Sequence, residues 1–435
     1  MSQLCILLIA LSSLGILSLL IFKGAIISPQ FAFVMCFTPG IIYAFAYVDK
    51  WNLELTDLTV ITILLGCSVF WGASIFFNIF FRKFSLKTHS VRILSCSDSI
   101  HNLRQKLVLL SFLQIVTILL TYLFLYKNYG SHLSEAMYSY RVLSTTHSPE
   151  FVEIPAFIKM LRRICLSIGF LSSYIFIYEI VYKRNNSPKI ALFCTVLSII
   201  NSISLGARGD AVHIILAAVI QFLVLSGIKN KGHILNVRSF IKIFSIFLFI
   251  FLSFSFVGEL LGRQMSFLEF GDYIAVYLSA ELKNLDSFVS LEHFGATFYD
   301  SQILSSISRI LSILFQDPAI EHPLVNPFRF VNGYALGNVS TIFYAFLYDG
   351  GFCGLIIFTI IMSLVCQYSF YKAVSSPPEQ ISLSIIIYSY IYYTIVFSFF
   401  SNKFYEMILN PVFMYFLLVL YVAKKFFYKK ISIGR

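Results

Sequence analysis

The chain has 435 residues, of which 58% are hydrophobic and only 12% are charged, and its formal net charge is +11. Since an ordinary soluble chain is about 25% charged, this composition excludes a soluble globular enzyme. The basic residues lie in short connections between apolar stretches, which is the pattern of membrane topology signals, so the charge does not indicate a nucleic-acid partner.

Apolar stretches long enough to cross about 30 Å of hydrocarbon recur along the chain. They predict eleven transmembrane helices, at residues 2–22, 26–47, 58–81, 107–126, 161–182, 190–206, 211–227, 240–262, 352–371, 381–400 and 407–423. The first is interpreted as a span and not as a signal peptide, because it has neither a basic segment before it nor a clean cleavage site. We therefore expect an all-α polytopic membrane protein, with residues 1–435 forming a single integral membrane domain.

The distribution of lysine and arginine predicts the topology. The connections 82–106, 183–189 and 228–239 and the C-terminal tail are basic, which indicates the cytoplasmic side. The outer side then holds the N-terminus and the segments 48–57, 127–160, 207–210, 263–351 and 401–406. The eight cysteines have no disulfide-framework spacing, so no structural disulfide is expected.

Residues 263–351 form an outer loop of about ninety residues, and a loop of this length is typically functional or disordered. Two helical patterns argue for order. The first is capped by Asp272 and has one apolar face, formed by Ile274, Leu278, Leu282, Leu285 and Val289. The second, from Ser301 to Gln316, is amphipathic, with Arg309 in the middle of its polar face. Such a helix lies in the membrane interface or closes over a cavity.

The segment from Ser204 to Asp210 is an abrupt polar turn between two apolar spans, and it contains Arg208. One interpretation is a hairpin tip in which Asp210 caps the next helix. The other is a functional site, because Asp210 and His213 lie on one face of a span and an ionisable residue inside a span is a functional hypothesis by default.

Other polar residues have two interpretations each. Glu259 and Arg263 are spaced as an interfacial ion pair or as part of a site. The stretch from Pro318 to Arg329, with His322, is a solvated loop or a binding segment. The aromatic residues of the long loop suit a membrane-interface belt or sugar stacking. The chain has no Asp-x-Asp, P-loop, zinc or Gly-x-Ser-x-Gly pattern, so no metal or cofactor is expected.

Two short motifs carry a family resemblance. One is the run from Gly337 to Gly354, Gly-Asn-Val-Ser-Thr-Ile-Phe-Tyr-Ala-Phe-Leu-Tyr-Asp-Gly-Gly-Phe-Cys-Gly, and the other is Gly206-Ala207-Arg208-Gly209. Their order, the number of spans and the large late outer loop resemble the Wzy-type O-antigen polymerases of bacteria, which join oligosaccharide repeat units. An arginine–glycine spacing described for some members is absent.

The resemblance implies a metal-independent glycosyltransferase with a fold of the GT-C type in the bacterial inner membrane. Such enzymes transfer a growing glycan from undecaprenyl pyrophosphate to the non-reducing end of a new lipid-linked unit at the periplasmic face. The expected partners are the lipid-linked donor and acceptor, membrane lipids and a chain-length regulator.

The chemistry of this transfer suggests roles for charged residues. Planar arginine side chains stabilise the pyrophosphate, and the candidates are Arg208, Arg263, Arg309 and Arg329. The acceptor hydroxyl needs a base, and the candidates are Asp210, Glu259, Asp300 and His322. Asn338 and Asp349, within the longer motif, are further substrate-binding candidates.

Three other functions compete with a polymerase. A lipid-linked oligosaccharide flippase or another transporter is expected to have repeated halves and short loops, unlike this chain. An O-antigen ligase shares the fold and the donor but uses a different acceptor. An integral-membrane O-acetyltransferase would differ in its donor.

Overall fold

The computed structural model describes residues 1–22, 25–88, 102–130, 132–146, 148–183, 188–230, 270–290, 301–317, 328–375 and 379–429. The chain divides into two compact units, each assembled from segments far apart in the sequence. Unit 1 comprises residues 1–92, 267–372 and 391–413, and unit 2 comprises residues 93–266, 373–390 and 414–435. The described parts of the long outer loop therefore belong to unit 1.

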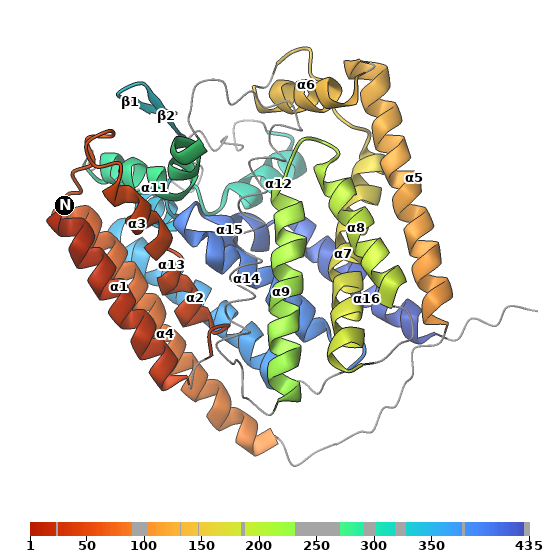
Figure 1. Cartoon of the computed structure of the whole chain (residues 1–435), viewed down its shortest axis with the longest axis horizontal. Coiled ribbons are helices and arrows are strands. Elements are labelled where there is room, and N and C mark those ends of the chain that lie inside the picture. Colours follow the sequence, from red (N-terminus) through yellow and green to blue (C-terminus); the bar gives the residue numbers. More distant parts are fainter. Residues whose placement is uncertain are drawn as a thin grey trace, which may run out of the picture. The chain divides into compact units, whose positions relative to one another are not determined.

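In its described residues, unit 1 contains seven complete α-helices, one 3-10 helix, a small hairpin and parts of helices that it shares with unit 2. These elements are α1 (Ser2–Ile21), α2 (Pro29–Met35), α3 (Thr38–Phe45), α4 (Asp57–Thr88), α11 (Phe270–Val289), α12 (Ser305–Phe315), the strands β1 (Arg329–Val331) and β2 (Tyr334–Gly337), most of α13 (Ile342–Ser375), the 3-10 helix η2 (Phe397–Phe399) and α15 (Lys403–Ile408). Figure 1 shows their order. The hairpin is antiparallel and turns at Asn332-Gly333, where both residues have positive φ as a tight two-residue turn requires.

Helices α1 and α4 of unit 1 run in one direction, and the short helices α2 and α3 between them run in the opposite direction (Figure 1). Gly15 of α1 lies against Met35 of α2, and Phe33 of α2 stacks on Phe70 of α4 at 4.0 Å between ring centroids. Helices α2 and α3 are thus antiparallel to both of their neighbours, α1 and α4. The start of α1 and the segment before α4 therefore lie at the same end of unit 1.

Helix α11 packs across that end. Ser279 Oγ donates to the carbonyl of Gly40 in α3 at 2.7 Å, and Lys50 Nζ donates to Asp272 Oδ1 at 3.1 Å. Asp286 Oδ1 accepts from the backbone N–H of Thr56 at 2.8 Å. Residues 48–57 and α11 thus lie at the same end of unit 1.

The structure corrects the role of Asp272. Helix α11 already includes Phe270, so Asp272 lies within its first turn and is not its cap. Burial opposes the charge of Asp272, but hydrogen bonds from Tyr47 and Lys50 outweigh it and lower the pKa of this carboxyl. The predicted apolar face is correct, because Ile274 and Leu285 are buried.

Unit 2 is a bundle around one central helix. It comprises α5 (Leu103–Tyr129), α6 (Leu133–Thr145), α7 (Ala156–Val181), α8 (Pro188–Ile203), α9 (Gly209–Lys229), the first part of α14 (Leu383–Val396) and most of α16 (Pro411–Tyr428). Helix α7 packs against α5, α8 and α9 (Figure 1). Polar side chains join the helices: Gln221 of α9 accepts from Ser173 of α7 at 2.9 Å and donates to Ser389 of α14 at 3.1 Å. Such bonds satisfy polar groups that hydrocarbon cannot solvate.

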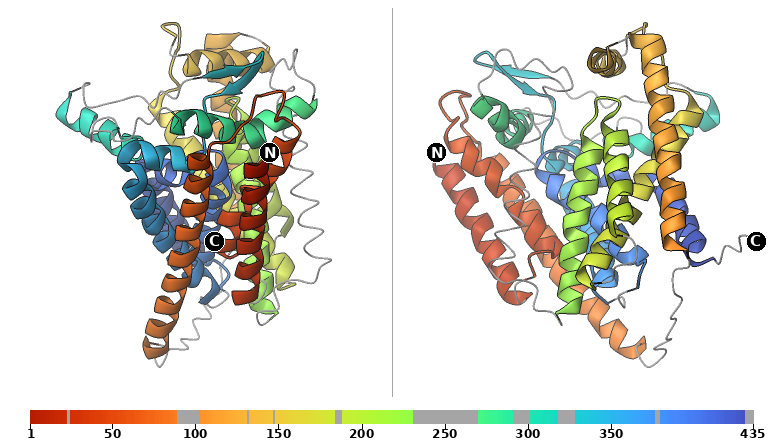
Figure 2. Two further views of the ribbon diagram at one scale, coloured as in Figure 1. Left: turned by 90° about the vertical axis from the view of Figure 1, so that its left-hand side faces the viewer. Right: turned by 45° about the vertical axis from the view of Figure 1, so that its right-hand side comes forward.

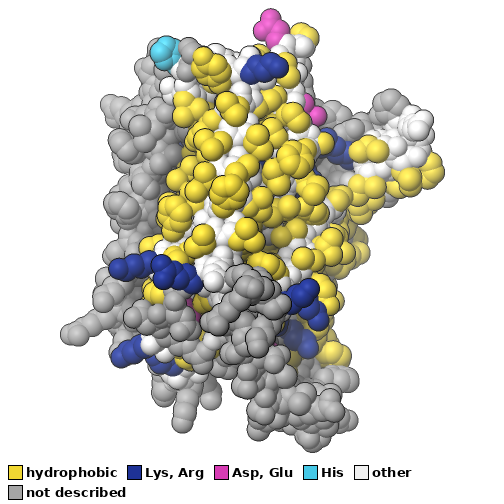
Figure 3. Space-filling view, turned by 90° about the vertical axis from the view of Figure 1, so that its right-hand side faces the viewer, with side chains coloured by type: hydrophobic (Ala, Val, Ile, Leu, Met, Phe, Trp, Pro, Cys, Tyr) yellow, Lys and Arg dark blue, Asp and Glu magenta, His cyan; other side chains and the backbone are white. Residues whose placement is uncertain are grey.

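Seven helices in the described residues are long and apolar enough to cross a membrane: α1, α4, α5, α7, α9, α13 and α16. A helix that crosses a membrane needs apolar side chains on its outer surface. Helix α5 has such a surface, because four of its apolar side chains are more than half exposed: Leu109, Phe112, Leu119 and Leu123. The side of the molecule on which α5 lies is covered by hydrophobic side chains, with charged ones toward its upper and lower ends (Figure 3). The chain is thus a multi-pass all-α membrane protein.

The structure differs from the sequence prediction in the course of two predicted spans. The span at 26–47 is interrupted at Cys36 and Phe37, so it consists of two short helices. The span at 352–371 is part of a longer helix that begins at Ile342 and breaks at Gly350 and Gly351. Gly351 has φ 57° and ψ −149°, a conformation that a side chain would oppose. The predicted span 240–262 lies outside the described residues.

Glu281 is buried in α11, and neither of its carboxylate oxygens has a hydrogen-bond partner among the described residues. Burial raises the pKa of this carboxyl well above its usual value of about 4.3. Between these two pKa values the folded state binds a proton that the unfolded state releases, so stability falls as the pH rises.

We therefore expect Glu281→Gln to have a higher melting temperature than the wild type at pH 8, and the difference to vanish near pH 4. Thermal unfolding in detergent across this range measures it, with the exposed Glu54→Gln as the control. Parallel pH profiles of wild type and Glu281→Gln would show that Glu281 folds in its charged form.

Candidate functional site

The polar turn between α8 and α9, in unit 2, is surrounded by arginine side chains. Arg162 of α7 donates through one terminal nitrogen to Ser204 Oγ at 2.5 Å, to Asn201 Oδ1 at 3.2 Å and to Thr121 Oγ1 at 3.4 Å. Arg208 ends the turn at the N-cap position of α9, and its side chain is only 5% exposed. The turn is therefore packed and hydrogen-bonded at Ser204 and Arg208, although Gly209 and Asp210 are exposed.

A third arginine lies against the same turn. Gly206 has φ +73°, and a Cβ at this position would lie 3.1 Å from the carbonyl oxygen of Met137 and 3.3 Å from Cβ of Arg141. Both of those residues belong to α6, which covers the turn. Only glycine suits this conformation and this close approach, so Gly206 brings Arg141 next to the backbone that carries Arg208.

The partners of Arg162 are neutral. Its hydrogen bonds to described residues all go to hydroxyl or amide oxygens from the single nitrogen Nη1, which leaves Nη2 and Nε without a hydrogen bond to the described chain. Asp210 is the carboxylate whose charge acts on Arg162, but the two form no ion pair within the described residues. A guanidinium held in a largely apolar bundle by neutral oxygens keeps its charge available for an anion.

The first turn of α9 adds to this electrostatic field. Its N-cap residue, Arg208, makes no side-chain cap, and the N-terminus of a helix favours a negative group. Asp210, in that turn, is exposed, whereas His213 is buried. His213 Nε2 is 2.9 Å from the carbonyl of Tyr390, and its ring packs on Phe170. His213 is thus a core histidine and does not share the environment of Asp210.

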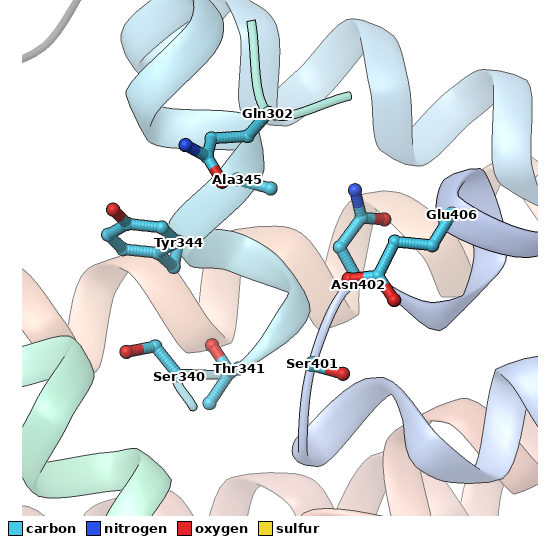
Figure 4. Close-up of a pocket in the computed structure, with 8 residues that line it drawn as sticks. All are labelled: Gln302, Ser340, Thr341, Tyr344, Ala345, Ser401, Asn402 and Glu406. Carbon is cyan, nitrogen blue, oxygen red and sulfur yellow. The ribbon is translucent and has the colours of Figure 1, made fainter. Parts of the chain in front are cut away.

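Unit 1 contains a separate polar pocket, with a volume of about 70 Å³. Three elements line it: the start of α13 with the residues before it, the segment before α12, and the segment from η2 to α15 (Figure 4). The lining residues are Gln302, Ser340, Thr341, Tyr344, Ala345, Ser401, Asn402 and Glu406.

Two of the substrate-binding candidates from the sequence, Asp349 and Arg329, lie beside this pocket. Asp349 accepts from Ser301 Oγ at 2.5 Å and from the backbone N–H groups of Gln302 at 2.7 Å and Ile303 at 2.9 Å. It therefore holds the segment that presents Gln302 to the pocket. Arg329 in β1 is half-buried and lies within electrostatic range of the lining residue Tyr344, and burial lowers the pKa of its guanidinium.

Arg309 and Asn338 lie outside the pocket lining, and both are exposed. Helix α12 projects sideways from unit 1 (Figure 2, left). Its serine side, with Ser308 and Ser312, is buried, while Ile313 and Leu314 are 70% and 69% exposed. The polar face predicted for this helix is thus buried at its serines, and the exposed apolar stripe is the kind of surface that suits a membrane interface.

Four candidates, Glu259, Arg263, Asp300 and His322, lie outside the described residues. Among the described residues, no three His, Cys, Asp or Glu side chains come together as a metal site. The interpretation of the sequence overlooked Arg162, Arg141 and the pocket residues Asn402 and Glu406. A signal for Arg162 existed, because it lies within the predicted span 161–182, where an ionisable residue indicates function.

Comparison of the chain with protein families, with curated proteins and with solved structures found no match to any of them.

Proposed function

We propose that this protein polymerises oligosaccharide repeat units carried on undecaprenyl pyrophosphate. The observation that carries the proposal is the arginine turn of unit 2, where Arg162 is held by neutral oxygens beside Gly206 and Arg208 at the end of membrane-spanning helices. A lipid diphosphate has its anionic group at the end of an apolar chain, so it matches a cationic site at the end of apolar helices.

The reaction needs little from the protein beyond charge stabilisation and positioning. The acceptor hydroxyl forms a bond to the anomeric carbon of the growing glycan, and the bond from that carbon to the pyrophosphate oxygen breaks. Undecaprenyl pyrophosphate leaves with the electron pair, and a base takes the hydroxyl proton. Arg162 and Arg208 stabilise the leaving diphosphate, while Asp210, exposed in the first turn of α9, is a candidate base.

We further propose that the chain crosses the bacterial inner membrane eleven times with a GT-C type fold and has its active face in the periplasm. Seven long apolar helices support part of this arrangement. The hydrogen bonds that join residues 48–57 to α11 support one common side for these two segments.

The lipid-linked species that accumulate in a deletion strain test the function. A polymerase deletion leaves single repeat units on undecaprenyl pyrophosphate at the periplasmic face, accessible to an added glycosidase in spheroplasts, and lipid A carries at most one unit. Single units protected inside the cell would instead indicate a flippase, and long lipid-linked polymer would indicate a ligase. Either of these results overturns the proposal.

A further inference from the structure

We propose that the pocket of unit 1 is a binding site for one sugar ring, lined on one side by Thr341 and Tyr344 and on the other by Ser401, Asn402 and Glu406. That this sugar belongs to a lipid-linked glycan rests on the proposed function. The polar groups and the shape of the pocket indicate a sugar ring independently of that function.

Buried polar atoms without a protein partner converge on this pocket. Thr341 Oγ1, Ser401 Oγ and Asn402 Nδ2 make no hydrogen bond to the described chain, and Thr341 and Asn402 are only 1% and 6% exposed. Leaving a buried donor or acceptor unsatisfied costs about 1–3 kcal/mol. Three such atoms around one cavity indicate a site whose hydrogen bonds are completed by a polar ligand.

The kinds of atom favour a neutral polyol. The Asn402 amide donates, the Glu406 carboxylate accepts, and the hydroxyls of Thr341 and Ser401 do either. The positive charge of Lys403 is engaged by Glu406 at 2.6 Å, so the lining does not offer a free cation for a phosphate. A sugar has hydroxyls of both capacities around one ring, and this mixture matches the lining.

The pocket also offers an aromatic ring. Tyr344 lies opposite Asn402 and Glu406 (Figure 4), and its ring is held by Phe288 at 4.5 Å between centroids. The C–H face of a sugar packs on such a ring. A cavity of about 70 Å³ is several times the roughly 10–15 Å³ that one water occupies, so it admits the face of a single ring and not an oligosaccharide.

Contacts outside the pocket fix its polar groups in place. Asn402 Oδ1 accepts from the backbone N–H of Tyr405 and so caps α15, which leaves Nδ2 for the pocket. Asp349 holds the backbone of Gln302 on the other side. Preorganised groups of this kind lose little entropy when a ligand binds.

The test uses the full chain in nanodiscs and a panel of methyl pyranosides with gluco, galacto, rhamno and N-acetylglucosamine configurations. Saturation-transfer NMR titrations give their affinities. At least one glycoside is expected to bind, and Thr341→Val and Asn402→Asp are each expected to weaken it about tenfold. Thr341→Val preserves shape, and Asn402→Asp keeps the oxygen that caps α15.

Thr359→Val is the matched control, because Thr359 Oγ1 is also buried and unpartnered in α13 but does not line the pocket. It is expected to bind like the wild type. The proposal falls if no methyl pyranoside binds, or if Thr341→Val and Asn402→Asp bind like Thr359→Val. Glycoside binding that depends on the pocket in a protein whose deletion leaves polymer unchanged would uphold the pocket and overturn the proposed function.

Discussion

Arg162→Lys is expected to reach wild-type levels in the membrane and yet to lower the polymerisation rate about ten- to a hundredfold. Lysine keeps the positive charge that Ser204 and Asn201 surround, so insertion and folding persist. It lacks the planar fork that binds one anion while also donating to the turn, and a lost charge-assisted hydrogen bond costs about 1.5–3 kcal/mol. In a complemented deletion strain, the lipopolysaccharide ladder should shrink to lipid A with one repeat unit.

Arg163→Lys is the matched control. Arg163 is the next residue of α7 and is exposed, and its carbonyl, not its guanidinium, accepts the hydrogen bond from Ser167 Oγ at 3.1 Å. Its substitution should leave the ladder unchanged. If Arg162→Lys also gave a wild-type ladder at wild-type protein levels, the arginine turn would have no part in donor binding, and the anion site would have to be sought at Arg329 or Arg263.

Asp286→Ala is expected to destabilise unit 1 by about 3 kcal/mol or more. Asp286 is 4% exposed, and one of its oxygens accepts from Thr56 N at 2.8 Å, Thr56 Oγ1 at 2.9 Å and Thr59 Oγ1 at 2.8 Å. It therefore joins the start of α4 to α11, where the helix dipole also favours a carboxylate. Alanine would leave these donors unsatisfied in a buried place. Thermal unfolding in detergent and membrane expression measure the loss.

Asp286→Asn keeps an accepting oxygen and should lose less stability than Asp286→Ala. Asp57→Ala is the control for charge near the start of α4, because Asp57 is exposed in the first turn and its loss should cost less than about 1 kcal/mol. A melting temperature of Asp286→Ala equal to that of Asp57→Ala would mean that α11 does not depend on this contact.

The sequence by itself determined that most of this chain is surrounded by lipid and not by water. Its low charge and long apolar stretches require a membrane, since no soluble surface can be covered with them. It also located the turn at Arg208, because polar residues between two apolar spans stand out. Helical periodicity predicted the buried face of α11, since the spacing of residues along a helix decides which side chains lie on one face.

Only the tertiary structure decided which distant residues share a site. Arg162 and Arg208 are 46 positions apart in the sequence, and the packing of α7 against α8 and α9 brings both to one turn. The pocket residues Thr341 and Asn402 likewise precede different helices, α13 and α15. Periodicity predicts that a face is buried but not what it meets. Helix α12 shows the difference, because it buries Ser308 and Ser312 and exposes Ile313 and Leu314.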